Sequence, residues 1–100
     1  MDSTFEWDEV KAAANWRKHR VTFEFARRAF ADPFAIVVHD RIESGEYRWQ
    51  TIGMIDGVAI LLVAHSFPRG EEGVVRIISA RHATPAERRY YDRANRAQLF

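Results

Sequence analysis

Arginine, glutamate and histidine side chains recur in the second half of this sequence where they could act together on a phosphodiester. Arg48, His65 and Arg76 lie within or beside apolar segments typical of strands. Glu46 comes two positions before Arg48. The planar fork of arginine matches phosphate geometry and can stabilise charge that develops there, while a carboxylate or an imidazole can accept the proton of an attacking hydroxyl. These residue types suit phosphodiester cleavage, with Arg81 as a further cation.

A predicted hairpin positions these side chains. Asp56-Gly57 lies between two apolar runs and is the strongest short hairpin signal in the chain. If these two residues form the turn, counting outward places Arg48 opposite His65, with Glu46 two positions along on the same face. If the next hairpin also closes tightly, Arg76 lies opposite His65 on a third strand. A slip of one residue would send Arg76 to the other face.

Arg81 can reach the same face as Arg76 only if their strand is irregular. The two residues are five positions apart and have opposite parity on an unbroken strand. A bulge near Ser79 would bring them to one face. A helix should then begin after Thr84, a good N-cap that forms a capping box with Glu87.

The other elements predict one α+β domain over residues 1–100. A short strand at 5–7 precedes two helices, capped by Asp8 and Thr22 and ending near residues 19 and 31. Strands are expected over 35–39, 48–55 and 58–67 and through Arg76, followed by the C-terminal helix. We therefore predict a mostly antiparallel sheet of about four strands after the helix pair. The pair should cover one face and the last helix part of the other.

Composition excludes several classes of protein and site. The chain has no cysteine, so disulfides, a thiolate nucleophile and cysteine-based zinc sites are excluded. No spacing of His or carboxylate residues predicts a metal centre, and no glycine-rich loop predicts a cofactor site. The acidic amino terminus and the lack of a long apolar run predict a cytoplasmic protein.

The net charge of +1 is unevenly distributed along the chain. Residues 76–100 contain six arginines and two acidic residues, a surplus of four positive charges. Residues 1–75 contain nine Lys and Arg against twelve Asp and Glu, a deficit of three. A basic end indicates an anionic partner, although a solvated helix face has the same composition.

The sequence resembles the BrnT toxins of bacterial toxin–antitoxin pairs, small ribonucleases with a RelE-like fold. The resemblance covers nearly the whole chain and is carried by Trp7-Asp8, Asn15, Lys18-His19, Gly45-Glu46-x-Arg48, Gly53 and Arg76-Ile77-Ile78-Ser79-Ala80-Arg81, followed by Ala83 and Glu87. Phe25 departs from the pattern, because a glutamate there would complete a second capping box. His82 and Tyr90-Tyr91 are this chain's own.

The resemblance implies a toxin that cleaves mRNA and inhibits translation. It also implies a BrnA-like antitoxin, a ribbon-helix-helix protein that binds operator DNA, in a heterotetramer of two toxins and two antitoxins. The toxin would contact operator DNA only through the antitoxin. Candidate RNA-binding residues are Lys18, His19, Arg69 and Arg88. We expect no cofactor and no metal, with attack by the 2′-hydroxyl of the RNA leaving a 2′,3′-cyclic phosphate.

The residues leave several alternatives open. The general base could be Glu46, His65 or His19. His65 could equally be a packing residue, and Glu46 and Arg48 could form only a surface ion pair worth at most about 1 kcal/mol. A non-catalytic module of the same fold that binds protein or RNA is the alternative function.

Overall fold

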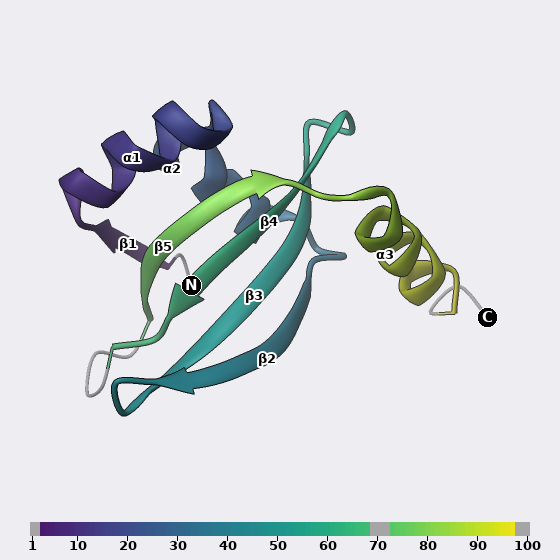
Figure 1. Ribbon diagram of the computed structural model, residues 1–100. Coiled ribbons are helices and arrows are strands. Elements are labelled where there is room, and N and C mark those ends of the chain that lie inside the picture. The colour runs from purple at the N-terminus through teal and green to yellow at the C-terminus, as the bar shows by residue number, and fades with distance from the viewer. Residues whose placement is uncertain (1–2, 69–72, 98–100) are drawn as a thin grey trace.

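The computed structural model describes residues 3–68 and 73–97, which form one five-stranded sheet and its helices (Figure 1). In chain order the elements are β1 (Thr4–Trp7), α1 (Glu9–His19), α2 (Phe23–Ala26), η1 (Arg27–Ala31), β2 (Ile36–Glu43), β3 (Glu46–Ile55), β4 (Ala59–Ser66), β5 (Val74–His82) and α3 (Pro85–Ala97). The strand order is β1-β5-β4-β3-β2. The α+β prediction is confirmed, but the short first strand joins the sheet as a fifth strand, parallel to β5.

Side-chain caps start the helices where the sequence predicts them. Asp8 accepts hydrogen bonds from the first turn of α1, and Thr22 accepts one from the Phe25 N–H at 3.0 Å. Thr84 and Glu87 form the predicted capping box, with reciprocal bonds of 2.8 and 3.2 Å. The second helix is shorter than expected, because the α-helical turn of α2 tightens into the 3-10 helix η1 after Ala26.

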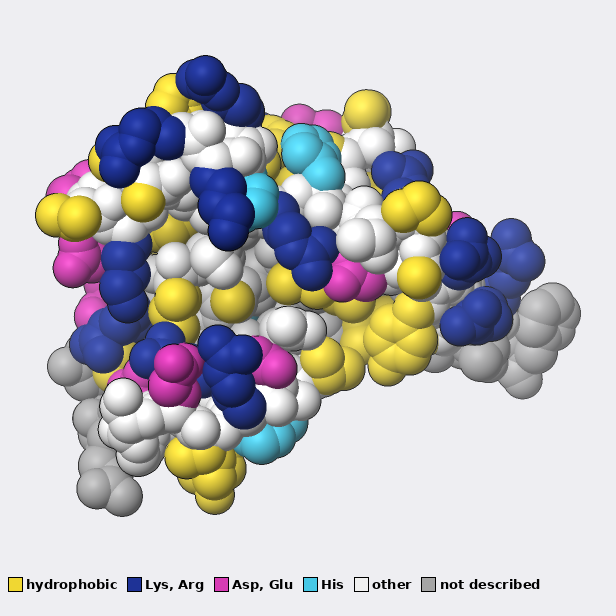
Figure 2. All heavy atoms as spheres, in the orientation of Figure 1, with side chains coloured by type: hydrophobic (Ala, Val, Ile, Leu, Met, Phe, Trp, Pro, Cys, Tyr) yellow, Lys and Arg dark blue, Asp and Glu magenta, His cyan; other side chains and the backbone are white. Residues whose placement is uncertain are grey.

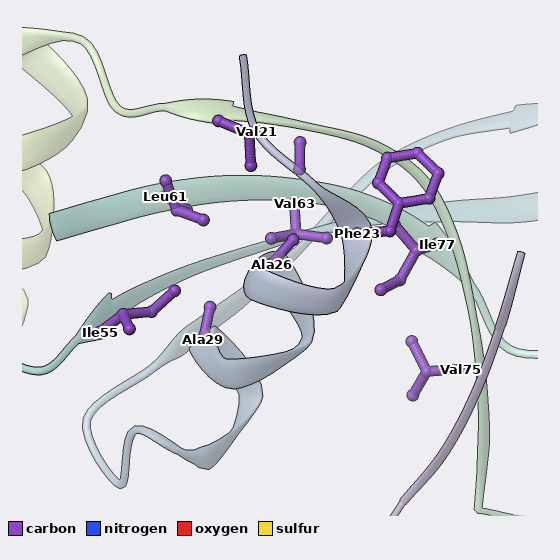
Figure 3. Close-up of a cluster of buried hydrophobic side chains, with 10 residues drawn as sticks. Val21, Phe23, Ala26, Ala29, Ile55, Leu61, Val63, Val75 and Ile77 are labelled. Carbon is purple, nitrogen blue, oxygen red and sulfur yellow. The ribbon is translucent and has the colours of Figure 1, made fainter. Parts of the chain in front are cut away.

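The two faces of the sheet are covered differently, as predicted. On one face, α1, α2 and η1 enclose the main core, where Phe23, Ala26 and Ala29 face the strands (Figure 3). On the other face, α3 covers only one end, and its Tyr91 packs against Ile52, Ile60 and Leu62. The Tyr91 hydroxyl donates to Asp32 at 2.6 Å. The remainder of this second face is not covered by a helix of the described chain, and we call it the open face (Figure 1).

The register of the β3–β4 hairpin differs by one residue from the prediction. Asp56 and Gly57 have positive φ angles, but Ile55 pairs with Ala59, so Val58 is an extra residue in the turn. His65 therefore lies opposite Trp49. The prediction that Arg48 faces His65 is wrong, because adjacent residues on a strand point to opposite faces.

A bulge in β5 changes which arginines share a face. Arg76 pairs with Ser66, not with His65 as predicted, and the register shifts between His65 and Ala64. The shift leaves Ile78 as an extra residue, since His65 pairs with Ile77 and Ala64 with Ser79. Arg76 and Arg81 consequently lie on the same face, the arrangement expected for a bulge near Ser79.

Candidate active site

The strands β1, β5 and β3 bring two arginines and two glutamates together on the open face, with β4 lying between β5 and β3. Arg76 on β5 donates from Nε to Glu6 Oε2 on β1 at 2.8 Å. Its terminal nitrogen Nη1 lies 3.7 Å from Glu46 Oε2 on β3. Arg48 follows on β3, two positions from Glu46 and on the same face. In Figure 2, which views this face, Lys and Arg side chains are interleaved with Asp and Glu at the lower end of the sheet.

Arg48 is the least exposed of these charged groups. Its side chain is 18% exposed, and its closest acidic partner is Glu43, 3.8 Å from Nε. The Arg48 Nε and the hydroxyl of Ser66 are both buried without a hydrogen-bond partner among the described residues. A nearly buried cation whose one ion pair is 3.8 Å long contributes little to the stability of the fold, because the cost of burying the charge is not fully offset. Its position is better suited to holding an anion against the sheet.

His65 lies on the helix-covered face, away from Arg48. It is 0% exposed, its Nε2 lies 2.7 Å from the Thr51 hydroxyl, and its ring packs edge-on against Phe30 and Phe67. Burial disfavours the imidazolium and lowers the pKa of His65 to about 4. This geometry fits the packing alternative and separates His65 from the arginines.

Arg81 lies at the other end of the open face, next to α3. Its guanidinium forms a two-pronged ion pair with Glu87, at 2.8 and 3.0 Å. The hydrogen bond from Arg81, more than any other cause, lowers the pKa of Glu87 to about 2, and the same bond raises the pKa of Arg81. Four ladder positions separate Arg76 from Arg81, roughly 13 Å along the strand. Arg81 is therefore not in contact with the Arg48 and Glu46 group.

The remaining predicted residues lie in several places. Lys18 and His19 end α1 and line a hollow that also contains Arg81. Arg88 is exposed on α3. Arg69 lies outside the described residues.

Sequence reasoning missed Glu6 and Ser66 as neighbours of the arginines. Glu6 pairs with Arg76 across a parallel contact between segments 70 residues apart, for which no local pattern exists. The alternation of the short first strand does place Glu6 on the sheet face opposite to Phe5 and Trp7, which pack against the core. Ser66 pairs with Arg76 only because of the register that the extra residues produce.

Residues 3–68 and 73–97 contain no group of three or more His, Cys, Asp or Glu side chains arranged to hold a metal ion. No helix in these ranges has the length and apolarity needed to cross a membrane.

Known proteins resemble this chain in both sequence and fold. A search of curated proteins found no match. Among solved structures, the Brucella abortus ribonuclease toxin BrnT matches with a TM-score of 0.65 and 24% identity over 82% of this chain and 97% of that one. This likeness supports the fold, while the RelE-like relation stays a prediction. Residues 7–87 match the family described as the ribonuclease toxin BrnT of type II toxin–antitoxin systems, and this chain belongs to that family.

Proposed function

We propose that this protein is a metal-independent endoribonuclease that cleaves mRNA and inhibits translation as the toxin of its pair. The observation that carries the proposal is the grouping of Arg48, Arg76 and Glu46 on the uncovered face of the sheet. The two guanidinium groups and the carboxylate of Glu46 supply both parts of the chemistry. The arginines provide positive charge for the phosphorane that a metal ion could otherwise supply, and the carboxylate provides a base.

Glu46 is the proposed base. Its side chain is 33% exposed and sits 3.7 Å from Arg76, close enough for the cation to hold it beside a bound phosphate. Glu46 would take the proton of the 2′-hydroxyl as the 2′-oxygen attacks phosphorus. The bond from phosphorus to the 5′-oxygen then breaks, and that oxygen takes a proton from water. The products are a 2′,3′-cyclic phosphate and a 5′-hydroxyl.

The two arginines have different roles in this scheme. Arg48 is nearly buried, so its guanidinium is held in place before RNA binds and can stabilise the phosphorane without reorganisation. Arg76 is 43% exposed and already shared between Glu6 and Glu46. It would contact the same phosphate and orient Glu46. His65, being buried on the other face, takes no part.

The proposed partner is a BrnA-like antitoxin with a ribbon-helix-helix DNA-binding domain. An acidic segment of that antitoxin would cover the arginines of the open face and block phosphate contacts without unfolding the toxin. Because such ion pairs are partly exposed, added salt should weaken the complex. Equal affinity at low and high salt would contradict this mode of neutralisation.

The test of the proposed chemistry is RNA cleavage in EDTA, with an oligoribonucleotide offered free and as part of a ribosome-bound message. We expect cleavage that survives EDTA and a cyclic phosphate at the new 3′ end. Arg48→Ala removes one donor to the phosphorane and should slow cleavage on the order of 100-fold. Glu46→Gln should slow it comparably by removing the base.

The matched control is Arg28→Ala. Arg28 lies on η1 and is ion-paired with Asp56 at 2.6 Å, in the turn that follows β3, so its loss removes an arginine at the opposite end of β3 from Glu46. This variant should cleave at the wild-type rate. Cleavage of an RNA with a 2′-deoxy sugar at the cut site, or activity lost in EDTA and restored by magnesium, would show the mechanism to be wrong.

A further inference from the structure

A hollow of about 530 Å³ lies between α1 and β5, separate from the Arg48 group. Its polar lining comes from Lys11, Asn15, Lys18, His19, Ser79 and Arg81. No carboxylate lines it. In Figure 2, Lys and Arg side chains gather over α1 at the upper part of the same view. The hollow therefore has the charge of a site for an anion.

Asn15 holds the two walls of this hollow at a fixed distance. Its amide nitrogen donates to the carbonyl oxygens of Val21 and Ala80, both at 2.9 Å. Its amide oxygen accepts the Ala80 N–H at 3.0 Å. The side chain is 6% exposed and its hydrogen-bonding capacity is used by the backbone. Asn15 is thus a structural clamp, and a ligand would contact the cations around it.

The two lysines are the groups available for that contact. Among the residues described here, Lys11 and Lys18 form no ion pair, whereas Arg81 is engaged by Glu87. Lys11 and Lys18 are seven residues apart on α1 and lie on the same side of the helix. An anion in the hollow could therefore receive both ammonium groups.

The bulge in β5 connects this hollow to the proposed cleavage site. The extra residue Ile78 places Ser79 and Arg81 on the face that carries Arg76. The distance from Arg76 to Arg81 is roughly 13 Å, which a stacked nucleic-acid strand spans in about four nucleotides and an extended strand in fewer. One strand of RNA can thus follow the open face from Arg76 to Arg81, where the lysines of α1 line the same hollow as Arg81.

We infer that the hollow between α1 and β5 binds a second backbone phosphate of the RNA substrate, two to four nucleotides from the cleaved bond, through Lys11 and Lys18. This inference rests on the proposed function, since it takes RNA to be the substrate of the open face. It makes the enzyme dependent on the length of the RNA. A dinucleotide fills only the Arg48 site, and longer strands gain the second contact.

The test measures binding separately from cleavage. Oligonucleotides of two, four, six and eight residues with 2′-fluoro sugars lack the attacking hydroxyl and stay intact. Their affinity is measured by fluorescence anisotropy for the wild type, for Lys18→Ala and for the double variant Lys11→Ala/Lys18→Ala. The control is Arg17→Ala, which removes an exposed cation of α1 that does not line the hollow. Unchanged thermal melting confirms that the variants are folded.

We expect the six- and eight-residue strands to bind more weakly to the lysine variants. One lost phosphate contact lowers the salt slope of a single strand by about 0.7, which corresponds to about fivefold in affinity at 0.1 M salt. Binding of the dinucleotide, and all binding by Arg17→Ala, should be unchanged. An equal loss for every length, or no loss for any, would overturn the subsite. Weaker antitoxin binding with unchanged RNA binding would also overturn it, by assigning the hollow to the protein partner.

The subsite and the cleavage chemistry can fail independently in these experiments. Length-dependent binding by a wild type that cleaves no RNA would refute the nuclease mechanism and support the subsite. If the wild type cleaved RNA but the lysine variants bound strands of every length normally, the subsite would be refuted and the nuclease mechanism supported.

Discussion

Mild acid should destabilise this protein through His65, before most carboxylates take up protons. The ring is fully buried, and its pKa is lowered from 6.5 to about 4 by burial. The unfolded chain therefore binds a proton at His65 below pH 6.5, while the folded chain does not until pH 4. The contribution to stability is complete above about pH 6.5 and is lost as the pH falls toward 4.

The size of the loss follows from the shift in pKa. A shift of 2.5 between 6.5 and about 4 corresponds to about 3 kcal/mol in total, and about 2 kcal/mol of this is already lost at pH 5. A domain of this size has a total stability of about 5–15 kcal/mol, so the loss should be easy to measure. Between pH 7 and 5, the other lowered pKa, that of Glu87 at about 2, contributes little.

The assay is urea unfolding at pH 7, 6 and 5. The variant is His65→Phe/Thr51→Val, which replaces both partners of the buried 2.7 Å hydrogen bond by apolar groups. Its free energy of unfolding should change by less than about 0.5 kcal/mol over this range, because it has no buried imidazole. The control His82→Gln removes an exposed histidine and should retain the wild-type loss.

Two results would refute this reasoning. If the double variant lost as much stability as the wild type between pH 7 and 5, the acid-sensitive group would lie elsewhere. If the folded variant cleaved RNA on the order of 100-fold more slowly at pH 7, His65 would act in catalysis despite its burial.

Three substitutions test other contacts by the free energy of unfolding in urea. Glu87→Gln should cost about 1 kcal/mol at pH 7, after allowance for the 25% exposure of the side chain. Since the pKa of Glu87 is lowered, the difference in stability from wild type should vanish as the pH falls from 4.5 to about 2. A difference that stays constant with pH would contradict the ion pair with Arg81. Asn15→Ala should cost about 3 kcal/mol or more, because three backbone groups lose their partner; a loss below 1 kcal/mol would contradict the clamp. Gly53→Ala should cost about 1–3 kcal/mol, because its Cβ would lie 2.3 Å from the Ala29 carbonyl oxygen; a neutral result would mean that η1 moves freely.

The features that the sequence predicts correctly depend on contacts between near neighbours. The caps at Asp8, Thr22 and Thr84 each join a side chain to a backbone group two or three residues away. Strand positions follow from alternation and from apolar runs, which are also local. The unequal covering of the two sheet faces follows from the order of the helices in the chain, with α1, α2 and η1 before β2 and α3 after β5.

The positions of the site residues depend instead on single extra residues. Asp56-Gly57 predicts a hairpin but does not distinguish a two-residue loop from the observed three-residue one, in which Val58 is 79% exposed. That one residue moves His65 from the face of Arg48 to the core. The contact between Glu6 and Arg76 spans 70 residues, so no pattern in the sequence could reveal it.

The extra residues Val58 and Ile78 have opposite consequences for the ionisable side chains, and together they determine which of these side chains lie on the open face. Val58 moves the imidazole of His65 into the core, where burial lowers its pKa and favours the neutral form. Ile78 brings Arg81 onto the face of Arg76, so that cations follow one another along β5 and not on alternate faces. A flexible RNA strand follows a surface most easily when its phosphate partners lie on one side. Under the proposed function, the irregularity in β5 therefore extends the proposed cleavage site into a track for the RNA substrate.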